Sequence, residues 1–410
     1  MTASLIGVNA SLTNLNLQRN SLKDKGVKVI CEALQSNKGT KLASLNVASN
    51  GVGPVGAKAV AAMAAVVASV TVINVLRNNF DAESAKMLTE LAKQKGLSLC
   101  GIQRNQTIAN FCMQGLEPAD AILLASDLSQ ADVTPNLTSI DLSRNSIGEA
   151  FYVKPDELSG ASLTEGSKVS YQGQEVTVLQ EEDEDGDIQI TNVGILQLAE
   201  ALRVCASVTD LNLYDNSLKD EGVTTICKAV QSNKETKLAS LNFGRNSVGI
   251  VGAEAVAAMV AVVPSLTSLD VRSNNIADEG ASKLSSAVLG NTKIEVFNKV
   301  PIKEMRADSF TELNLEGKNI GVAGGMVVAG LLPDMASLTE CKLRVNKLGV
   351  EVWTIIFNAL CDSTIIFDAL CDSPASKITI WDLSREFLGP KIAKPLAEYI
   401  SVTASLTSVR

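Results

Sequence analysis

One short pattern recurs along this chain about every 28 residues and constrains its fold more than any other feature. The pattern is Leu-x-x-Leu-x-Leu-x-x-Asn-x-Leu-x-x-x-Gly, and its first full copy occupies residues 12–26. Further copies begin at Leu42, Val70, Leu137, Val208, Leu238, Leu266 and Leu338. Such self-similarity predicts a solenoid, in which each repeat buries its apolar face against its neighbours.

Each part of the pattern predicts a local structure. The alternation of Leu15 and Leu17 puts two apolar side chains on one face of a short strand. The amide of Asn20 can bond to backbone groups of the following turn, so stacked copies should form a ladder. Beyond the glycine the apolar spacing becomes helical, at Val27, Ile30, Cys31 and Leu34. The predicted fold class is α/β: a horseshoe solenoid with parallel strands on its concave face and helices on its convex face.

The length and the helical half of this repeat resemble the ribonuclease-inhibitor-like subfamily of leucine-rich repeats. The resemblance covers nearly the whole chain. The subfamily also includes the activator of the nuclear-transport GTPase Ran and the sensor ends of NACHT-type immune receptors. Because the motif consists of core and turn positions, it specifies the fold and says little about function.

A longer period lies over the short one. The stretch from Ser11 matches the stretch from Ser207 at a constant offset of 196 residues, which indicates duplication of a whole block of repeats. Weaker repeats lie around Leu97 and Leu116. We expect one continuous solenoid over residues 1–410, made of a first block (1–148), an insertion (149–193) and a second block (194–410).

The insertion separates the strand of one repeat from its helix. Within it, residues 168–171, 175–180 and 188–190 predict three short strands. Subtracting its eleven acidic residues and two lysines from the 45 acidic and 36 basic residues of the chain leaves 34 of each. We expect this acidic, β-rich insertion to project from one rim of the solenoid and to offer its acidic turn to a ligand. That turn contains Glu181, Glu182, Asp183, Asp185 and Asp187.

The acidic turn also has features of an EF-hand calcium loop. Glu181, Asp183, Asp185, Gly186 and Ile188 fall at loop positions 1, 3, 5, 6 and 8. However, position 1 is normally Asp, and Asn192 replaces the bidentate Glu of position 12. Since the flanks also predict strands, a solvated acidic hairpin is favoured over a metal site, and weak binding of a divalent ion stays open.

Composition argues against catalysis. Histidine is absent, which removes the commonest metal ligand and every Ser-His or Cys-His nucleophile pair. None of the eight cysteines has Cys-x-x-Cys spacing, so buried reduced thiols are expected. The glycines recur with the repeat and form no phosphate-binding loop. We therefore expect no enzymatic activity, no cofactor and no metal centre.

The same composition bears on location and partners. The most apolar run, residues 59–76, is interrupted by Ser69, Thr71 and Asn74, and no secretory signal is evident. An acidic insertion on a charge-balanced solenoid argues against nucleic acid as the main partner. We expect a cytoplasmic protein, monomeric and not bound to membranes, whose partner is another protein.

The strand residues that alternate with the leucines are the expected binding surface. Most are small or polar, and three sets differ. Val72, Leu76 and Leu99 predict an apolar patch on the early repeats. The second set combines an aromatic side chain with charges of both signs, as interface hot spots do: Asp210, Tyr214, Asp215, Asp270 and Arg272. Glu312 and Glu316 belong to a third, charged set that includes Glu340, Lys342 and Arg344.

Two functions are consistent with these features. The favoured one is a non-enzymatic scaffold or adaptor that binds a protein with its concave face and acidic rim. The alternative, implied by the resemblance to the Ran activator, is activation of a GTPase. That family typically carries a long acidic C-terminal tail, whereas the acidic segment of this chain is an internal insertion.

Residues 354–363 are repeated at 364–373, with Asp368 for Asn358. Ten extra residues at about 100° each would leave a continuous helix about 80° out of phase. We predict that one copy fills the normal helix position and the other forms an extra turn or a bulged connection. The alternative is a recent duplication or a sequencing artefact, without function.

Overall fold

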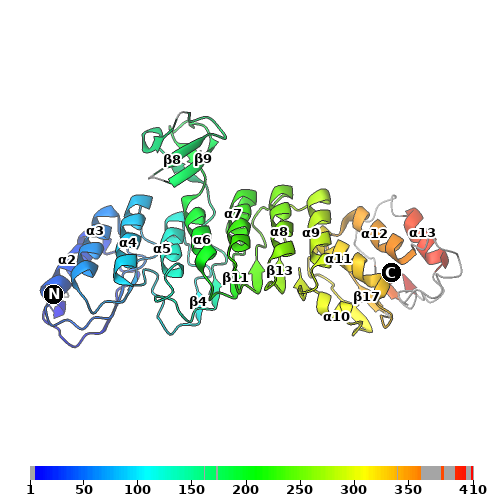
Figure 1. Ribbon diagram of the computed structural model, residues 1–410, viewed down its shortest axis with the longest axis horizontal. Helices are drawn as coiled ribbons and strands as arrows, with labels where there is room; N and C mark the ends of the chain where they lie inside the picture. The colour runs from blue at the N-terminus through cyan, green and yellow to red at the C-terminus, as the bar shows by residue number, and fades with distance from the viewer. Residues whose placement is uncertain are drawn as a thin grey trace. The chain divides into compact units, whose positions relative to one another are not determined.

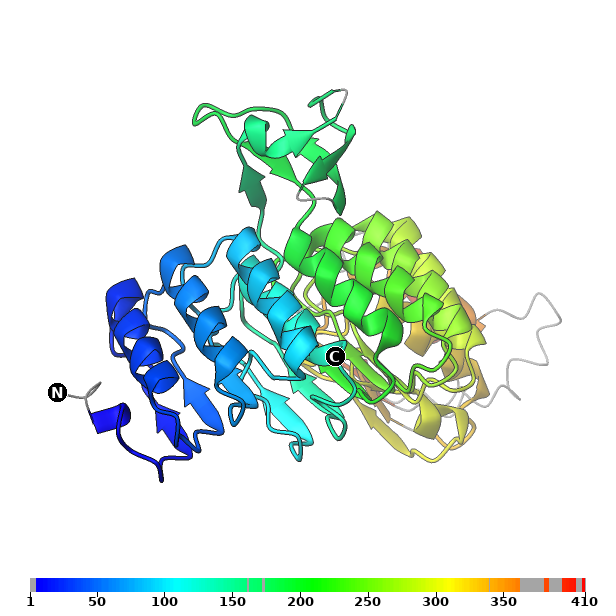
Figure 2. The ribbon, with the colours of Figure 1, turned by 60° about the vertical axis from the view of Figure 1, so that its left-hand side comes forward.

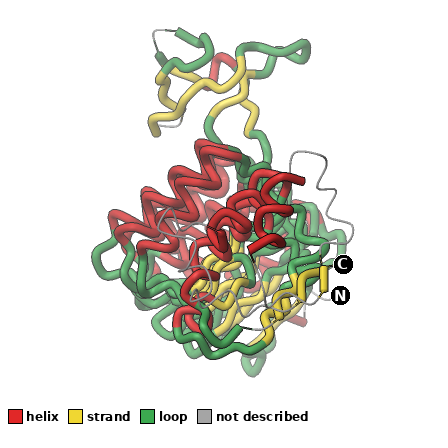
Figure 3. Tube along the Cα trace, turned by 90° about the vertical axis from the view of Figure 1, so that its right-hand side faces the viewer, coloured by secondary structure: helices red, strands yellow, loops and turns green. Residues whose placement is uncertain are grey.

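A computed structural model describes residues 5–160, 162–171, 174–338, 340–361, 380–382, 393–402 and 408–409. The chain divides into two compact units, Met1–Lys237 and Leu238–Arg410. Within each unit short parallel strands alternate with helices, and the helices cover one side of the strands (Figure 1, Figure 3). This alternation confirms the α/β repeat fold predicted from the sequence.

The first unit holds the early repeats and the insertion. Its repeat elements are β1 (Asn14–Asn16), α2 (Lys23–Ser36), β2 (Ser44–Asn46), α3 (Pro54–Val66), β3 (Val72–Asn74), α4 (Ala82–Lys95), β4 (Ile108–Asn110), α5 (Pro118–Leu128), β5 (Ser139–Asp141), α6 (Val193–Val204), β11 (Asp210–Asn212) and α7 (Lys219–Ser232). Strands β1, β2 and β3 pair in parallel and in register, with Leu15, Leu45 and Ile73 side by side. Strands β4, β5 and β11 form a second parallel set.

The second unit continues the alternation. Its elements are β12 (Ser240–Asn242), α8 (Ile250–Val262), β13 (Ser268–Asp270), α9 (Asp278–Gly290), β14 (Val296–Phe297), β15 (Val300–Pro301), α10 (Ile302–Arg306), β16 (Glu312–Asn314), α11 (Gly321–Leu331), the 3-10 turn η2 (Leu332–Asp334), β17 (Glu340–Lys342), α12 (Gly349–Cys361), β18 (Ile380–Asp382), α13 (Ala393–Val402) and β19 (Ser408–Val409). Its second parallel set runs in the order β16-β17-β18-β19. Helices α7 and α8 have the bounds of α2 and α3 shifted by 196 residues, so the duplicated blocks fold alike.

The repeated asparagines form the predicted ladder. Asn50 Nδ2 donates to the carbonyl oxygen of Leu17 in the preceding repeat (2.9 Å) and of Val47 in its own (3.0 Å). Its Oδ1 accepts from the backbone N–H groups of Asn20 (3.0 Å) and Leu22 (3.2 Å). Each amide thus satisfies turn backbone that is cut off from water, and it links two repeats.

A second ladder, which the sequence pattern did not predict, lies at the ends of the helices. Asn233 follows α7 and donates from Nδ2 to the carbonyl oxygens of Leu202 and Cys205, both at 2.8 Å. Asn37 after α2 and Asn291 after α9 reach back to the preceding repeat in the same way. These side chains replace lost helical hydrogen bonds at the carbonyl ends of the preceding helices.

The parallel sheet of the first unit is interrupted after β3. Ser98 and Cys100 form isolated bridges to β3, but among the described strands β4 pairs only with β5. Asp127, near the end of α5, takes the place of a neighbouring strand. Its carboxylate accepts from the Ser98 hydroxyl (2.7 Å) and from the backbone N–H groups of Leu99 (2.8 Å) and Cys100 (3.1 Å).

The insertion forms its own antiparallel sheet before α6 (Figure 2). The three predicted strands are present as β8 (Lys168–Tyr171), β9 (Gln174–Gln180) and β10 (Ile188–Ile190). Two more strands were not predicted: β6 (Phe151–Val153), and β7 (Leu158–Ser159) after the 3-10 turn η1 (Pro155–Glu157). The strand order is β6-β10-β9-β8-β7. Its core is closed by Phe151 and Tyr171, whose ring centroids lie 5.8 Å apart, edge to face.

The division into blocks 1–148, 149–193 and 194–410 stays a prediction. For the duplicated segment, the start of the first copy lies in α12, whereas the second copy, 364–373, lies outside the described residues.

Candidate functional site

The outward face of the strands carries the residues that alternate with the buried leucines. In β11, Asp210 and Asn212 are half-buried on either side of the buried Leu211, and the half-buried Tyr214 follows. Asp210 accepts a hydrogen bond from the Ser139 hydroxyl of β5 at 3.4 Å. Asp215 comes next, in a left-handed turn with φ of +58°. Strand β11 and the turn after it therefore place a tyrosine and two carboxylates in half-buried positions of the first unit.

The predicted apolar patch on the early repeats is wrong. Val72, Leu76 and Leu99 expose only 5%, 1% and 1% of their surface. The chain leaving Cys100 turns at Gly101 (φ +78°) onto the outward side of β3, where a Cβ on this glycine would lie 3.0 Å from Asn74 Nδ2. The sheet interruption thus brings chain over positions that an unbroken repeat would leave open.

In the second unit Asp270 and Arg272 form a rigid ion pair. Arg272 Nε donates to Asp270 Oδ1 at 2.9 Å, and Nη2 donates to Oδ2 at 2.8 Å. The third nitrogen, Nη1, donates to the carbonyl oxygen of Lys318 at 2.7 Å. Bidentate pairing of this kind fixes the guanidinium plane, so these two residues present a fixed shape with little net charge.

The late charged set is paired across repeats. Lys342 of β17 contacts Glu312 of β16 and, at 3.1 Å, Glu340. Arg344 likewise forms an ion pair with Glu316 of the preceding repeat. The carboxylates of this set therefore have cationic neighbours, and exposed pairs such as these contribute more to specificity than to stability.

The predicted second set divides between the two units. Asp210, Tyr214 and Asp215 belong to the first unit, whereas Asp270 and Arg272 belong to the second. The structure therefore describes two surfaces where the sequence suggested one. The binding roles of all these residues stay predictions.

The acidic turn of the insertion joins β9 to β10. Asp183 organises it: its Oδ1 accepts from the backbone N–H groups of Asp185 (3.0 Å) and Asp187 (2.9 Å). Asp187 in turn contacts Lys154 Nζ at 2.8 Å. Glu181, Glu182, Glu184 and Asp185 are exposed. Asn192, the residue at EF-hand position 12, instead caps α6 by accepting from the Ile195 N–H at 3.0 Å.

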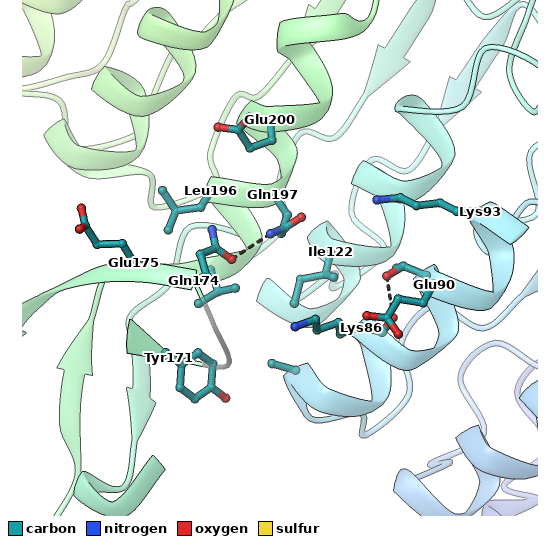
Figure 4. A pocket seen from close by; sticks show the side chains of 13 residues that line it. Lys86, Glu90, Lys93, Ile122, Tyr171, Gln174, Glu175, Leu196, Gln197 and Glu200 are labelled. Carbon is teal, nitrogen blue, oxygen red and sulfur yellow. Dashed lines mark hydrogen bonds between the residues drawn. The ribbon is translucent and has the colours of Figure 1, made fainter. Parts of the chain in front are cut away.

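A cavity of about 580 Å³ lies in the first unit between the insertion and the helices α4 and α6 (Figure 4). Helix α4 supplies the charged side chains of Lys86, Glu90 and Lys93. Helix α6 supplies Leu196, Gln197 and Glu200. The insertion supplies the aromatic Tyr171 together with Gln174 and Glu175. Gln197 Nε2 donates to Gln174 Oε1 at 2.8 Å and ties the insertion to the repeat. Sequence reasoning missed this cavity because no local signal shows which helices a projecting loop will touch.

The ionisable groups around the cavity include a protonated tyrosine and charged side chains of both signs. Burial, reinforced by Glu157 and Asp81, raises the pKa of Tyr171 to about 12, so its hydroxyl stays protonated at neutral pH. Lysines and glutamates are interspersed along the lining. This mixture favours a polar ligand or a protein side chain without a strong preference for either sign of charge.

The thiols of the core are not set up as nucleophiles. Burial and the neighbouring Glu32 raise the pKa of Cys31 to about 12, and burial beside Asp127 raises that of Cys100. Neither supplies a thiolate at neutral pH. Within the described ranges, no group of three or more Cys, Asp or Glu side chains is arranged to hold a metal ion. No helix among these residues is long and apolar enough to cross a membrane.

Comparison with known proteins agrees with the fold. Residues 8–31, 40–61, 204–227 and 264–285 match the family model described as Leucine Rich repeat. The chain is similar to NACHT, LRR and PYD domains-containing protein 5 of Mus musculus, with 24% identity over 326 residues, covering 69% of this chain and 27% of that protein. It is also similar to the ribonuclease inhibitor of Mus musculus, with 26% identity over 168 residues, 38% of this chain and 36% of that protein.

The chain thus spans well under two thirds of the length of either relative. Among solved structures, an internalin from Listeria monocytogenes is 15% identical and aligns over 100% of this chain and 88% of its own, with a TM-score of 0.34. The matched repeats and the two mouse relatives place the pattern in a known family. Together they support a leucine-rich repeat protein of the ribonuclease-inhibitor-like kind.

Proposed function

We propose that this protein is a non-enzymatic scaffold or adaptor that binds another protein through the outward strand face and the acidic insertion. The observation that carries the proposal is the half-buried Tyr214, which follows β11 in the chain and has the half-buried Asp210 and Asp215 before and after it in sequence. Tyrosine supplies a large, rigid contact area and a polar tip, which is why it is common at binding hot spots. One relative is named for inhibiting a ribonuclease, itself a protein.

Several finer features belong to the same proposal. The strands would line the concave side of a horseshoe, and the insertion would project from its rim. The protein would act as a monomer in the cytoplasm, away from membranes and nucleic acids. Both proposed surfaces are polar, and the acidic turn repels a phosphate backbone.

Affinity capture from the native cell lysate tests the proposal. We expect the intact chain to retain a partner, and Tyr214→Ala to reduce the retained amount on the order of tenfold. Val204→Ala is the matched control, because it removes an exposed apolar side chain (65% exposed) from the end of α6. Equal capture by all three proteins, or no capture by the intact chain, would remove the support for a strand-face site.

The alternative is activation of a GTPase of the Ran type. A multiple-turnover GTP hydrolysis assay with such GTPases separates the two functions. Acceleration on the order of a hundredfold or more at catalytic amounts of the chain would replace the scaffold proposal.

A further inference from the structure

We propose that the free edge of β4 is a docking site for an acidic, extended segment of a protein partner. The inference rests on the protein-binding function proposed above and deepens it, since it names the place, the geometry and the chemistry of the partner. It is carried by three features of the described part of the first unit: a strand edge that pairs with no other described strand, two exposed apolar side chains, and two arginines whose guanidinium groups form no ion pair there.

Among the described strands, the main chain of β4 pairs with another strand on only one of its two sides. Ser139 N–H donates to the Thr107 carbonyl (3.1 Å) and Phe111 N–H donates to the Asp141 carbonyl (2.8 Å), so alternate residues of the strand bond to β5. In a parallel ladder the intervening residues, Ile108 and Asn110, then direct their backbone groups to the other side. The chain segment next to β3 does not pair with them, because Asp127 binds its N–H groups.

Two glutamines of the same loop region protect this edge. Gln106 Nε2 donates to the Ile108 carbonyl at 2.7 Å, and Gln114 Nε2 donates to the Asn110 carbonyl at 3.1 Å. Side chains that cover an edge are a common protection against unwanted strand pairing. An incoming strand would replace each side-chain amide by a backbone amide, an exchange of equivalent hydrogen bonds, while the released glutamines return to water.

Apolar side chains accompany the edge. Ile108 is 62% exposed at the start of the strand, and Met113 is 66% exposed in the turn that follows it. The equivalent outward residues of β2 and β5, Ser44 and Ser139, are polar and half-buried. A partner that covers both Ile108 and Met113 gains hydrophobic contact that an ordinary repeat of this chain does not offer.

Two guanidinium groups flank the same turn. Arg144 Nη1 lies 3.7 Å from Met113 Sδ. Arg77 also lies close to this turn, since a Cβ on Gly115 would lie 3.4 Å from its Nη2. Within the described part of the chain, neither guanidinium forms an ion pair with a carboxylate, although the Arg77 backbone N–H donates to Asp120 Oδ1 at 2.8 Å.

These features define the partner. An extended segment added to β4 would bond to the backbone of Ile108 and Asn110 and place alternate side chains toward Ile108 and Met113. A carboxylate beyond the end of the strand would meet Arg77 and Arg144, which can hold it in bidentate fashion. The site therefore fits an acidic peptide segment with apolar residues at alternate positions.

Fluorescence polarisation with a defined probe tests the proposal. The probe is a fluorescein-labelled peptide of about eight residues in which Glu alternates with Ile, titrated with the full chain. We expect binding, weakened on the order of tenfold by Arg144→Glu and by Ile108→Ser. A version of the peptide with N-methylated backbone at alternate residues, and a version with Lys for Glu, should each bind at least about tenfold more weakly.

Arg19→Glu is the matched control. Arg19 is exposed at the same position of an early repeat and has nearly the same backbone, φ +59° against +57° for Arg144. Equal weakening by Arg19→Glu would overturn the site, since it would indicate nonspecific attraction. Absence of probe binding would overturn it as well. Sedimentation of the chain alone completes the test: a dimer abolished by Arg144→Glu would assign this edge to a second copy and overturn the peptide proposal.

Thermal melts of each variant, matching the wild-type curve, confirm that the variants are folded. The two proposals fail separately. Capture of a partner that is sensitive to Tyr214→Ala but not to Arg144→Glu would sustain the scaffold function and remove the β4 site.

Discussion

Asp127 and Ser98 are joined by a fully buried hydrogen bond of 2.7 Å that links the end of α5 to the segment beside β3. The carboxylate is enclosed by protein on all sides. Burial raises its pKa to about 6, and the hydrogen bonds from Ser98, Leu99 and Cys100 only partly oppose that effect. An edge of the sheet is thus closed by a group that titrates near neutral pH.

The first prediction concerns the pH dependence that follows. The pKa of Asp127 is near 3.8 when unfolded and about 6 when folded, so the folded state binds the proton more tightly. Its stabilising contribution is complete below about pH 4 and is lost as the pH rises through about 6. We expect the free energy of unfolding of the wild type, relative to Asp127→Asn, to fall by about 3 kcal/mol over this range.

Urea denaturation at a series of pH values measures this difference. Asp120, whose pKa burial also raises to about 6, is common to both proteins and cancels in the comparison. A difference between wild type and variant that does not change from pH 4 to pH 7 would contradict the prediction.

The second prediction concerns the asparagine ladder. Asn246 is completely buried and donates from Nδ2 to the carbonyl oxygens of Phe243 (3.0 Å) and Gly244 (3.1 Å). Asn246→Ala leaves buried backbone groups unpaired, so it should lower the free energy of unfolding by about 1–3 kcal/mol. Chemical denaturation measures the change. Asn20→Ala is the control, because Asn20 is exposed and its partners can bond to water instead; equal losses at both positions would refute the burial argument.

The third prediction concerns the insertion. Asn192 Nδ2 donates to the carbonyl oxygens of Ile147 (2.9 Å) and Glu149 (2.7 Å), so the two ends of the insertion lie within hydrogen-bond reach of each other. Replacing residues 150–191 by about four Gly and Ser residues, with Asn192 retained, should leave one cooperative thermal transition within a few degrees of the wild type. A broad, non-cooperative melt by circular dichroism would mean that the insertion supports the repeats.

The fourth prediction concerns the duplicated segment. If one copy alone fills the helix position, deleting residues 364–373 should preserve or raise the melting temperature, because the extra turn contributes no core. Differential scanning calorimetry measures it. A fall of more than about 5 °C would show that both copies are packed.

The repeat itself could be predicted from sequence because it is a local, recurring signal. Strand, turn and helix positions follow from the spacing of Leu15, Leu17 and Asn20, and the structure confirms their equivalents in most described repeats, with the segment around Leu97 as an exception. The helix-end ladder had a weaker signal, since Asn37 and Asn233 also recur at the 196-residue offset. The sequence analysis missed this ladder because a polar residue after a helix usually indicates only where the helix ends, and does not show that its side chain bonds to the preceding repeat.

The interruption after β3 could not be predicted from the repeat pattern. It depends on a carboxylate 27 residues beyond Cys100, bonding across the fold in place of a strand. Val72 and Leu99, on one side of this interruption, are buried, whereas Ile108, on the other, is exposed. Outward exposure in a solenoid depends on the neighbouring repeat, and a repeat that departs from the pattern changes the environment of its neighbours.

The reach of the ladder amides has a consequence for how the protein opens. The bonds of Asn50 and Asn78 to other repeats join residues 26 to 33 positions apart, so each amide links its own repeat only to an adjacent repeat. Contact order is therefore low, and folding or unfolding can propagate one repeat at a time. Amide hydrogen exchange should then follow the order of the repeats, with Ala substitution of a single ladder residue accelerating exchange in its two neighbours and leaving distant turns protected.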